Sequence, residues 1–210
     1  MPSPSFPSFD RRGVIAALGA LATVAALAAC GDPDSGDTID AAGSTDGAPA
    51  TIDAAPVVGE PAGLVGTTDA HNAVRAQVGV GPLTWDPALA AIAAAWAAQC
   101  HDTEAPIGLI DHNPGRSNGY PTYVGENIYG AGGQASGTDA VALWASEKAS
   151  YDHATNSCAA GRVCGHYTQI VWRNTTKVGC AIHNCPGLQF GSSVVCDYGP
   201  GGNIGGQSPY

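Results

Sequence analysis

Basic residues are scarce in this chain, which has 8 lysines and arginines against 18 acidic residues in a length of 210. Proteins that bind nucleic acid need positive charge along the phosphate backbone, so this balance argues against a DNA or RNA partner. Residues 31–66 hold six aspartates and one glutamate with no basic residue, whereas residues 67–210 hold ten acids and six bases. The part that folds is therefore expected to be only mildly acidic.

Residues 31–66 also lack aromatic side chains and consist mainly of Asp, Ala, Gly, Pro, Ser and Thr. A segment with so little apolar surface cannot offset the entropy lost on ordering. We therefore interpret residues 30–66 as Cys30 followed by a disordered acidic tether.

The apolar run at residues 13–29 is short and rich in alanine for a membrane span, which favours a cleaved signal peptide over residues 1–29. The tetrad Leu27-Ala28-Ala29-Cys30 resembles a bacterial lipobox, which implies lipidation of Cys30. An ordinary cleavage site with an unmodified cysteine is the alternative, and Arg11-Arg12 leaves both the Sec and the twin-arginine export routes open. We expect an exported protein, either secreted or held at the outer membrane or cell surface by its lipid anchor alone.

Six of the seven cysteines fall between positions 100 and 196, an even number that is typical of a disulfide framework. Two predicted strands, residues 178–184 and 189–198, flank a Pro186-Gly187 connection. Such a hairpin brings Cys180 and Cys196 close together, although the spacing alone leaves all fifteen pairings open.

Three helices are predicted before the hairpin from their caps and apolar spacing. They begin near Thr67 or Thr68, at Asp86-Pro87 and at Thr138-Asp139. Helices followed by paired strands in a disulfide-tied domain over residues 67–210 indicate an α+β sandwich.

The stretch from Cys164 to Cys180 combines a histidine with two cysteines and several polar side chains. Tyr167, Ile170 and Val171 recur at helical spacing, which predicts a short helix with one buried face. His166 then lies at its N-terminal end, after the turn that Gly165 permits.

A familiar metalloprotease signature is missing, because the chain contains no His-Glu-x-x-His. If all six cysteines of the domain are paired, no thiol remains as a nucleophile. The sequence therefore favours a site without a confident catalytic residue.

Several segments resemble the CAP superfamily, which includes cysteine-rich secretory proteins, insect antigen 5 proteins and plant pathogenesis-related proteins of the first group. The similarity runs from about residue 67 to the last residue, and the plant branch is the most similar. The matching segments are 71–86, Gly125-Glu126-Asn127, Trp144-Ala-Ser-Glu147, 165–172, 196–203 and Ser208-Pro209-Tyr210.

This resemblance implies a three-layer α-β-α sandwich whose cleft holds two histidines and two glutamates. The residues that it assigns to the cleft are His71, Glu126, Glu147 and His166. Two imidazoles and two carboxylates can bind a divalent metal, with zinc as the candidate. The resemblance also implies the disulfides Cys100–Cys185, Cys158–Cys164 and Cys180–Cys196.

Each cleft residue has a plainer alternative. His71 could form a hydrogen bond across a helix interface, Glu126 could cap a turn, and Glu147 could pair with Arg75 or Lys148. His101, His112, His153 and His183 are expected to be surface or structural groups, although His112 occupies a position that resembles a family histidine. Asp197 also departs from the family pattern, which has asparagine there.

The leading functional hypothesis is a secreted, lipid-anchored, monomeric binding module whose cleft holds a divalent metal. Its partner is an unidentified protein, lipid or cell-envelope component. The first alternative is a metal-dependent hydrolase of peptides or envelope polymers, with Glu126 and Glu147 as the candidate catalytic residues. The second is a sterol- or lipid-binding protein that uses residues 185–196, where Leu188 and Phe190 are the large apolar side chains.

Overall fold

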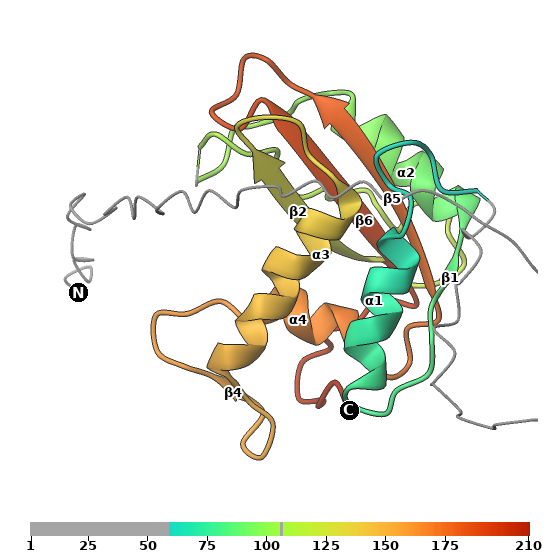
Figure 1. Ribbon diagram of the computed structural model, residues 1–210, viewed down its shortest axis with the longest axis vertical. Helices are drawn as coiled ribbons and strands as arrows, with labels where there is room; N and C mark the ends of the chain where they lie inside the picture. Colours follow the sequence, from blue (N-terminus) through green and yellow to red (C-terminus); the bar gives the residue numbers. More distant parts are fainter. Residues whose placement is uncertain (1–58, 106) are drawn as a thin grey trace, which may run out of the picture. The chain divides into compact units, whose positions relative to one another are not determined.

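The computed structural model describes residues 59–105 and 107–210 (Figure 1). The predicted signal peptide, Cys30 and most of the predicted tether lie outside these residues. Among the helices that are described, none has the length and apolar content needed to cross a membrane.

A four-stranded sheet in the order β1-β5-β6-β2 forms the middle layer. Its strands are β1 (Thr84–Trp85), β2 (Gly125–Ala131), β5 (Lys177–Asn184) and β6 (Ser192–Gly199). β1 runs parallel to β5, and the other pairs are antiparallel. All eight residues of β6 are buried, as expected for an inner strand with both faces covered. β2 is left as an edge of this sheet.

One face of the sheet is covered by α2 (Pro87–Ala97), as Figure 1 shows. Asp86 caps this helix by accepting hydrogen bonds from the backbone of Ala88 and Leu89 at 2.8 and 3.2 Å. A Cβ atom on Gly179 would lie 2.2 Å from the Ala90 nitrogen, so the glycine is what lets helix and strand pack so closely.

Three helices cover the opposite face of the sheet (Figure 1). They are α1 (Thr67–Ala76), α3 (Gly137–Ser146) and the short α4 (Gly165–Ile170). The 3₁₀ turn η1 (Glu147–Ser150) and the short strands β3 (Tyr151–Asp152) and β4 (Ser157–Cys158) connect α3 to α4. The predicted three-layer α-β-α sandwich is confirmed, and so is the short helix that begins beside His166.

The three disulfides implied by the family resemblance are all present. Cys100 bonds to Cys185, Cys158 to Cys164, and Cys180 to Cys196. The Cys180–Cys196 bond joins residues that face each other across β5 and β6, as the predicted hairpin required.

The packed domain begins earlier than residue 67, where the sequence placed its boundary. Leu64 is 1% exposed and belongs to the core on the α1 face. The Glu60 carboxylate accepts hydrogen bonds from the backbone of Gly66 and of Thr68, both at 2.7 Å, and so satisfies the free amides at the start of α1. Composition missed this because a single leucine and a single glutamate are enough to attach the segment.

Arg75 is the largest charged side chain in the core and is 1% exposed. Its guanidinium donates to the carbonyls of Gly81, Ile170, Trp172 and Thr175 at 2.6 to 3.0 Å. Burial lowers the pKa of Arg75 to about 10, which still leaves it charged at neutral pH. The side chain ties α1 to the end of α4 and to the turn that leads into β5.

Replacing Arg75 should therefore destabilise the domain strongly. Arg75→Met removes a donor from four carbonyls, of which only that of Trp172 keeps a bond within the described residues, from the Thr175 amide at 3.1 Å. We expect a loss of about 3–5 kcal/mol in the free energy of unfolding, since each buried unsatisfied acceptor costs roughly 1–3 kcal/mol. Arg75→Lys should lose less because an ammonium keeps three donors. Urea denaturation measures both, with the exposed Arg173→Met as the matched control. Equal stability of Arg75→Met and Arg173→Met would contradict this role.

Candidate functional site

The site is built around α4, which has only six residues and is too short to be stable alone. Glu147 accepts hydrogen bonds from the backbone nitrogens of His166 and Tyr167 at 3.0 and 3.1 Å, at the start of the helix. Arg75 donates to the carbonyls of Ile170 and Trp172 at its end. An anion at the N-terminus and a cation at the C-terminus both match the helix dipole, so the two charges fix α4 in place.

His166 is oriented by the same glutamate. Its Nδ1 lies 2.6 Å from Oε1 of Glu147, and its ring stacks on Trp144 with the centroids 6.1 Å apart. Burial opposes ionisation of Glu147, but the hydrogen bonds from His166 and the helix backbone outweigh it and lower the pKa of the carboxyl. When the carboxylate accepts a hydrogen bond from the Nδ1–H of a neutral His166, Nε2 keeps a free lone pair.

His112 and Glu126 form a second pair of the same kind. Oε1 of Glu126 accepts hydrogen bonds from His112 Nδ1 at 2.7 Å and from the Asn113 backbone at 2.9 Å. Glu126 lies on the edge strand β2 and is 9% exposed, whereas the imidazole of His112 is exposed. Here too the carboxylate holds Nδ1 and leaves Nε2 free.

A cleft over the edge of β2 contains both imidazoles. Two adjoining hollows of about 320 and 230 Å³ share His112, Val163 and His166 in their walls. Glu126 and Asn127 line the smaller hollow, and Leu109, Ile110 and Ile128 give the larger one an apolar wall. The structure therefore brings three of the four predicted site residues, Glu126, Glu147 and His166, to one place.

His71 is not part of this cleft, so the predicted grouping is wrong for this residue. It is 0% exposed, its Nδ1 donates to the Thr67 carbonyl at 2.8 Å, and its Nε2 accepts from the Tyr198 hydroxyl at 2.8 Å. Burial lowers the pKa of His71 to about 4, and the charge of Arg75 acts in the same direction. With both nitrogens used and the ring neutral, the side chain cannot bind a metal.

His71 instead supports the cleft from behind. The Tyr198 hydroxyl that donates to His71 accepts from the Asn127 amide at 3.1 Å, and the same amide donates to the His166 carbonyl at 3.1 Å. The sequence offered a hydrogen-bonding role across a helix interface as the plainer alternative, and in the structure that bond joins α1 to strand β6. His112, which the sequence grouped with the surface histidines, takes the second imidazole position.

Asp197 lies beside Glu126 as its partner across β2 and β6 and is 0% exposed. Within the part of the chain that the structure describes, neither of its oxygens has a hydrogen-bond partner, and Oε2 of Glu126 also has none. Burial, with a smaller contribution from the charge of Glu126, raises the pKa of Asp197 to about 8. At neutral pH the side chain is therefore mostly an uncharged acid, similar in charge and size to the asparagine it replaces.

This buried acid predicts a pH effect on stability. The pKa of Asp197 rises from 3.8 to about 8 on folding, so the folded state holds the proton more tightly and the free energy of unfolding falls as pH rises between these values. Asp197→Asn removes this loss and offers an amide donor to Glu126. We expect its stability relative to the parent to be greater at pH 8 than at pH 5 in urea denaturation.

The exposed Asp139→Asn is the matched control for this measurement. A stability difference between Asp197→Asn and the parent that does not change from pH 5 to pH 8 would contradict the raised pKa.

The remaining predicted site features lie elsewhere. His101, His153 and His183 are outside the cleft walls, and His183 lies beside the Cys100–Cys185 disulfide. In residues 185–196, Leu188 packs against the core on the α2 face, and Phe190 lies against Gly130. The two large apolar side chains of that segment therefore pack against the domain and are only partly exposed.

Comparison with known proteins identifies relatives over most of the domain. The chain is 47% identical to Pathogenesis-related protein 1B of Nicotiana tabacum over 143 residues, which cover 68% of this chain and 77% of that protein. It is 44% identical to Pathogenesis-related protein PR-1 type of Sambucus nigra over 144 residues, which cover 68% of this chain and 78% of that protein.

Solved structures share the fold. Venom allergen-like protein 4 of Schistosoma mansoni has a TM-score of 0.56 at 24% identity, covering 71% of this chain and 94% of that one. The crystal structure of NaASP2 with Zn²⁺ has a TM-score of 0.53 at 25% identity, and the match covers 69% of this chain and 82% of that one. The family model described as CAP, cysteine-rich secretory protein family, matches residues 68–198. The chain thus belongs to the CAP family of cysteine-rich secretory proteins.

Proposed function

We propose that this protein is an exported binding module whose cleft holds a divalent cation, with zinc as the candidate, between the imidazoles of His112 and His166. The observation that supports it is the pair of His–Glu contacts in one cleft. Each fixes an imidazole through Nδ1, at 2.7 and 2.6 Å, and leaves the other nitrogen for a ligand. Carboxylates that hold zinc-binding histidines in this way are a common second layer of metal sites.

The donor set fits a weakly held ion. No group of three donor atoms within 4.8 Å of one another occurs in the cleft among residues 59–105 and 107–210. Glu126 and Glu147 would therefore act by orienting the imidazoles, with water completing the coordination shell. The structure of NaASP2 with Zn²⁺ supports zinc as the ion for a related fold. A bound cation would supply Lewis acidity to a ligand in the cleft.

Membership of a secretory family supports an extracellular location. We propose in addition that lipidation of Cys30 attaches the exported protein to the cell envelope, with the domain acting as a monomer. The partner would be a protein, lipid or envelope polymer that reaches the cleft rim, where Val163 is 62% exposed.

Zinc titration by calorimetry tests the cleft. We expect the parent protein to bind one zinc ion and the double variant His112→Ala with His166→Ala to lose the heat, because both ligands are gone. His153→Ala removes an exposed imidazole outside the cleft and should bind normally. Binding should weaken as pH falls and the ligands become protonated. Equal heats for the parent and the double variant would remove the metal from the proposal.

A second candidate function, hydrolysis of peptides or envelope polymers, is favoured by the same contacts. An imidazole whose Nδ1 is held by a carboxylate is the usual arrangement of a general base. Here His112 or His166 would take a proton through Nε2, with Glu126 or Glu147 stabilising the charged ring.

Turnover of a peptide and envelope-glycan library separates this enzyme from a binding module. For the enzyme, we expect Glu126→Gln or Glu147→Gln, whichever supports the base, to lower the rate about 10²- to 10⁴-fold, because the imidazole loses the carboxylate that orients it and stabilises its charge. The exposed Glu104→Gln at the cleft rim is the control. Turnover that neither Glu126→Gln nor Glu147→Gln lowers, or no turnover at all, would contradict the enzyme.

A further inference from the structure

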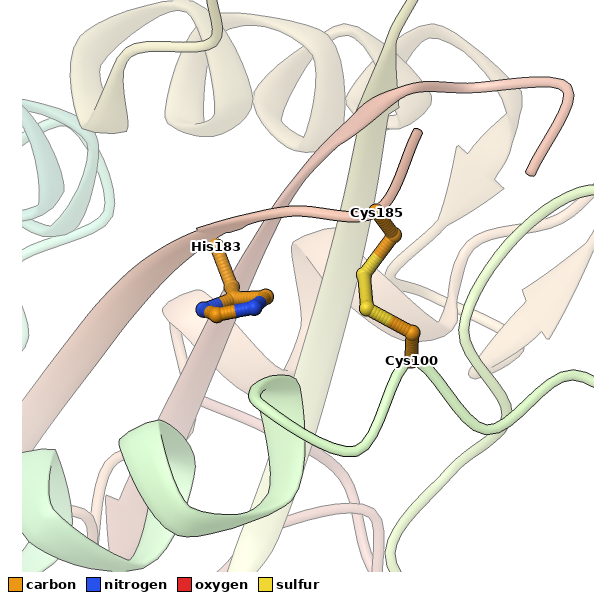
Figure 2. Close-up of side chains that lie close together, drawn as sticks. All are labelled: Cys100, His183 and Cys185. Atoms are coloured by element: carbon orange, nitrogen blue, oxygen red, sulfur yellow. A yellow bond between two sulfur atoms is a disulfide. The ribbon is translucent and has the colours of Figure 1, made fainter. Parts of the chain in front are cut away.

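A second group of metal-binding side chains lies at the C-terminal end of α2, outside the cleft. Cys100 follows this helix, while His183 and Cys185 lie at the end of β5 two residues apart, so both side chains leave the same face of the strand. Figure 2 shows the imidazole on the same side of the strand as the Cys100–Cys185 disulfide. One ligand atom from each of the three residues lies within 4.8 Å of the other two.

We propose that this group is a redox-gated site for zinc or a similar soft divalent ion. While the disulfide is intact, its sulfur atoms are not thiolates and the site is closed. When a dithiol reductant opens the Cys100–Cys185 bond, it gains a disulfide of its own and the protein gains two thiols. The thiols release their protons as the ion binds, and the imidazole of His183 becomes the third ligand.

The spacing suits this ion. Two ligands on one tetrahedral zinc lie about 3.5 to 3.8 Å apart, given bonds of about 2.3 Å to sulfur and about 2.0 Å to nitrogen. In the structure every pair of these ligand atoms lies within 4.8 Å, so side-chain rotation that separates the two released sulfur atoms can bring all three ligands to one ion. Two thiolates, one imidazole and a water molecule form a normal zinc coordination shell.

Backbone hydrogen bonds, as well as the disulfide, hold the chain around the three ligands. The Cys100 amide donates to the Ala97 carbonyl at 3.2 Å, and the Cys185 amide donates to the Gly191 carbonyl at 2.9 Å. His183 is held in the ladder between β5 and β6 opposite Ser193. These contacts should keep the ligands near one another after reduction.

The group also sets this disulfide apart from the other two. In the part of the chain that the structure describes, Cys100, His183 and Cys185 are the one group of three potential metal ligands. Neither the Cys158–Cys164 nor the Cys180–Cys196 bond belongs to such a group. Cys180 and Cys196 are almost fully buried. Cys185 is buried too, at 1% exposed, but Cys100 and His183 are partly exposed, so a reductant and an ion can reach this site from their side.

Cobalt(II) titration of the full chain tests the site, because thiolate–cobalt charge transfer gives an absorption band that imidazole alone does not. The protein is reduced with a dithiol, freed of reductant without air, and mapped by alkylation and mass spectrometry to show which bonds are open. We expect the band only after the Cys100–Cys185 bond opens. His183→Ala should weaken cobalt binding at least about tenfold, the lower end of the loss for metal-site partners.

Two variants serve as controls. Cys158→Ser with Cys164→Ser should keep the band, and so should His112→Ala with His166→Ala, which keeps this test independent of the cleft. Circular dichroism checks that the reduced protein stays folded. Absence of the band with the bond open, a band that His183→Ala leaves unchanged, or unfolding as soon as this bond opens would each overturn the proposal.

Discussion

The placement of α4 between two opposite charges is the interaction on which the site depends. Glu147 holds the first amides of this helix, and Arg75 holds the carbonyls at its end. A helix of six residues has no stability of its own, so its position is set by these contacts and by the core beneath it. Because Glu147 also accepts from Nδ1 of His166, one carboxylate fixes both the helix and the orientation of its imidazole.

The edge of the sheet explains why the cleft lies where it does. β2 pairs with another strand on one side only. The loop that follows α2 carries His112 to its free edge, and α4 on the other face of the sheet carries His166 there. Behind this edge, Asp197 keeps its proton beside Glu126, so that the buried layer carries one negative charge and not two. His71, Tyr198 and Asn127 join the same layer to the backbone of His166.

Sequence reasoning predicted most of the fold because the signals were local. The Asp86 cap, the strands around Pro186-Gly187 and the helix after Gly165 each depend on a few neighbouring residues. The disulfides followed from the family resemblance, and so did the grouping of Glu126, Glu147 and His166 in one region. His71 was misplaced because the family resemblance assigned it to the cleft, whereas the residue itself allowed the buried hydrogen-bonding role that the structure shows. His112 lies in a loop without periodicity, and only its resemblance to a family histidine pointed to it.

The central claim is that the two imidazoles, held through Nδ1 by Glu126 and Glu147, present their Nε2 atoms to one ligand in the cleft. A crystal structure of the zinc-soaked protein, with anomalous diffraction measured at the zinc absorption edge, tests it most directly. The account predicts an anomalous peak between the rings of His112 and His166, with both Nδ1–carboxylate contacts retained. A cleft without a peak, or a peak bound by Glu147 after it has left the start of α4, would contradict it.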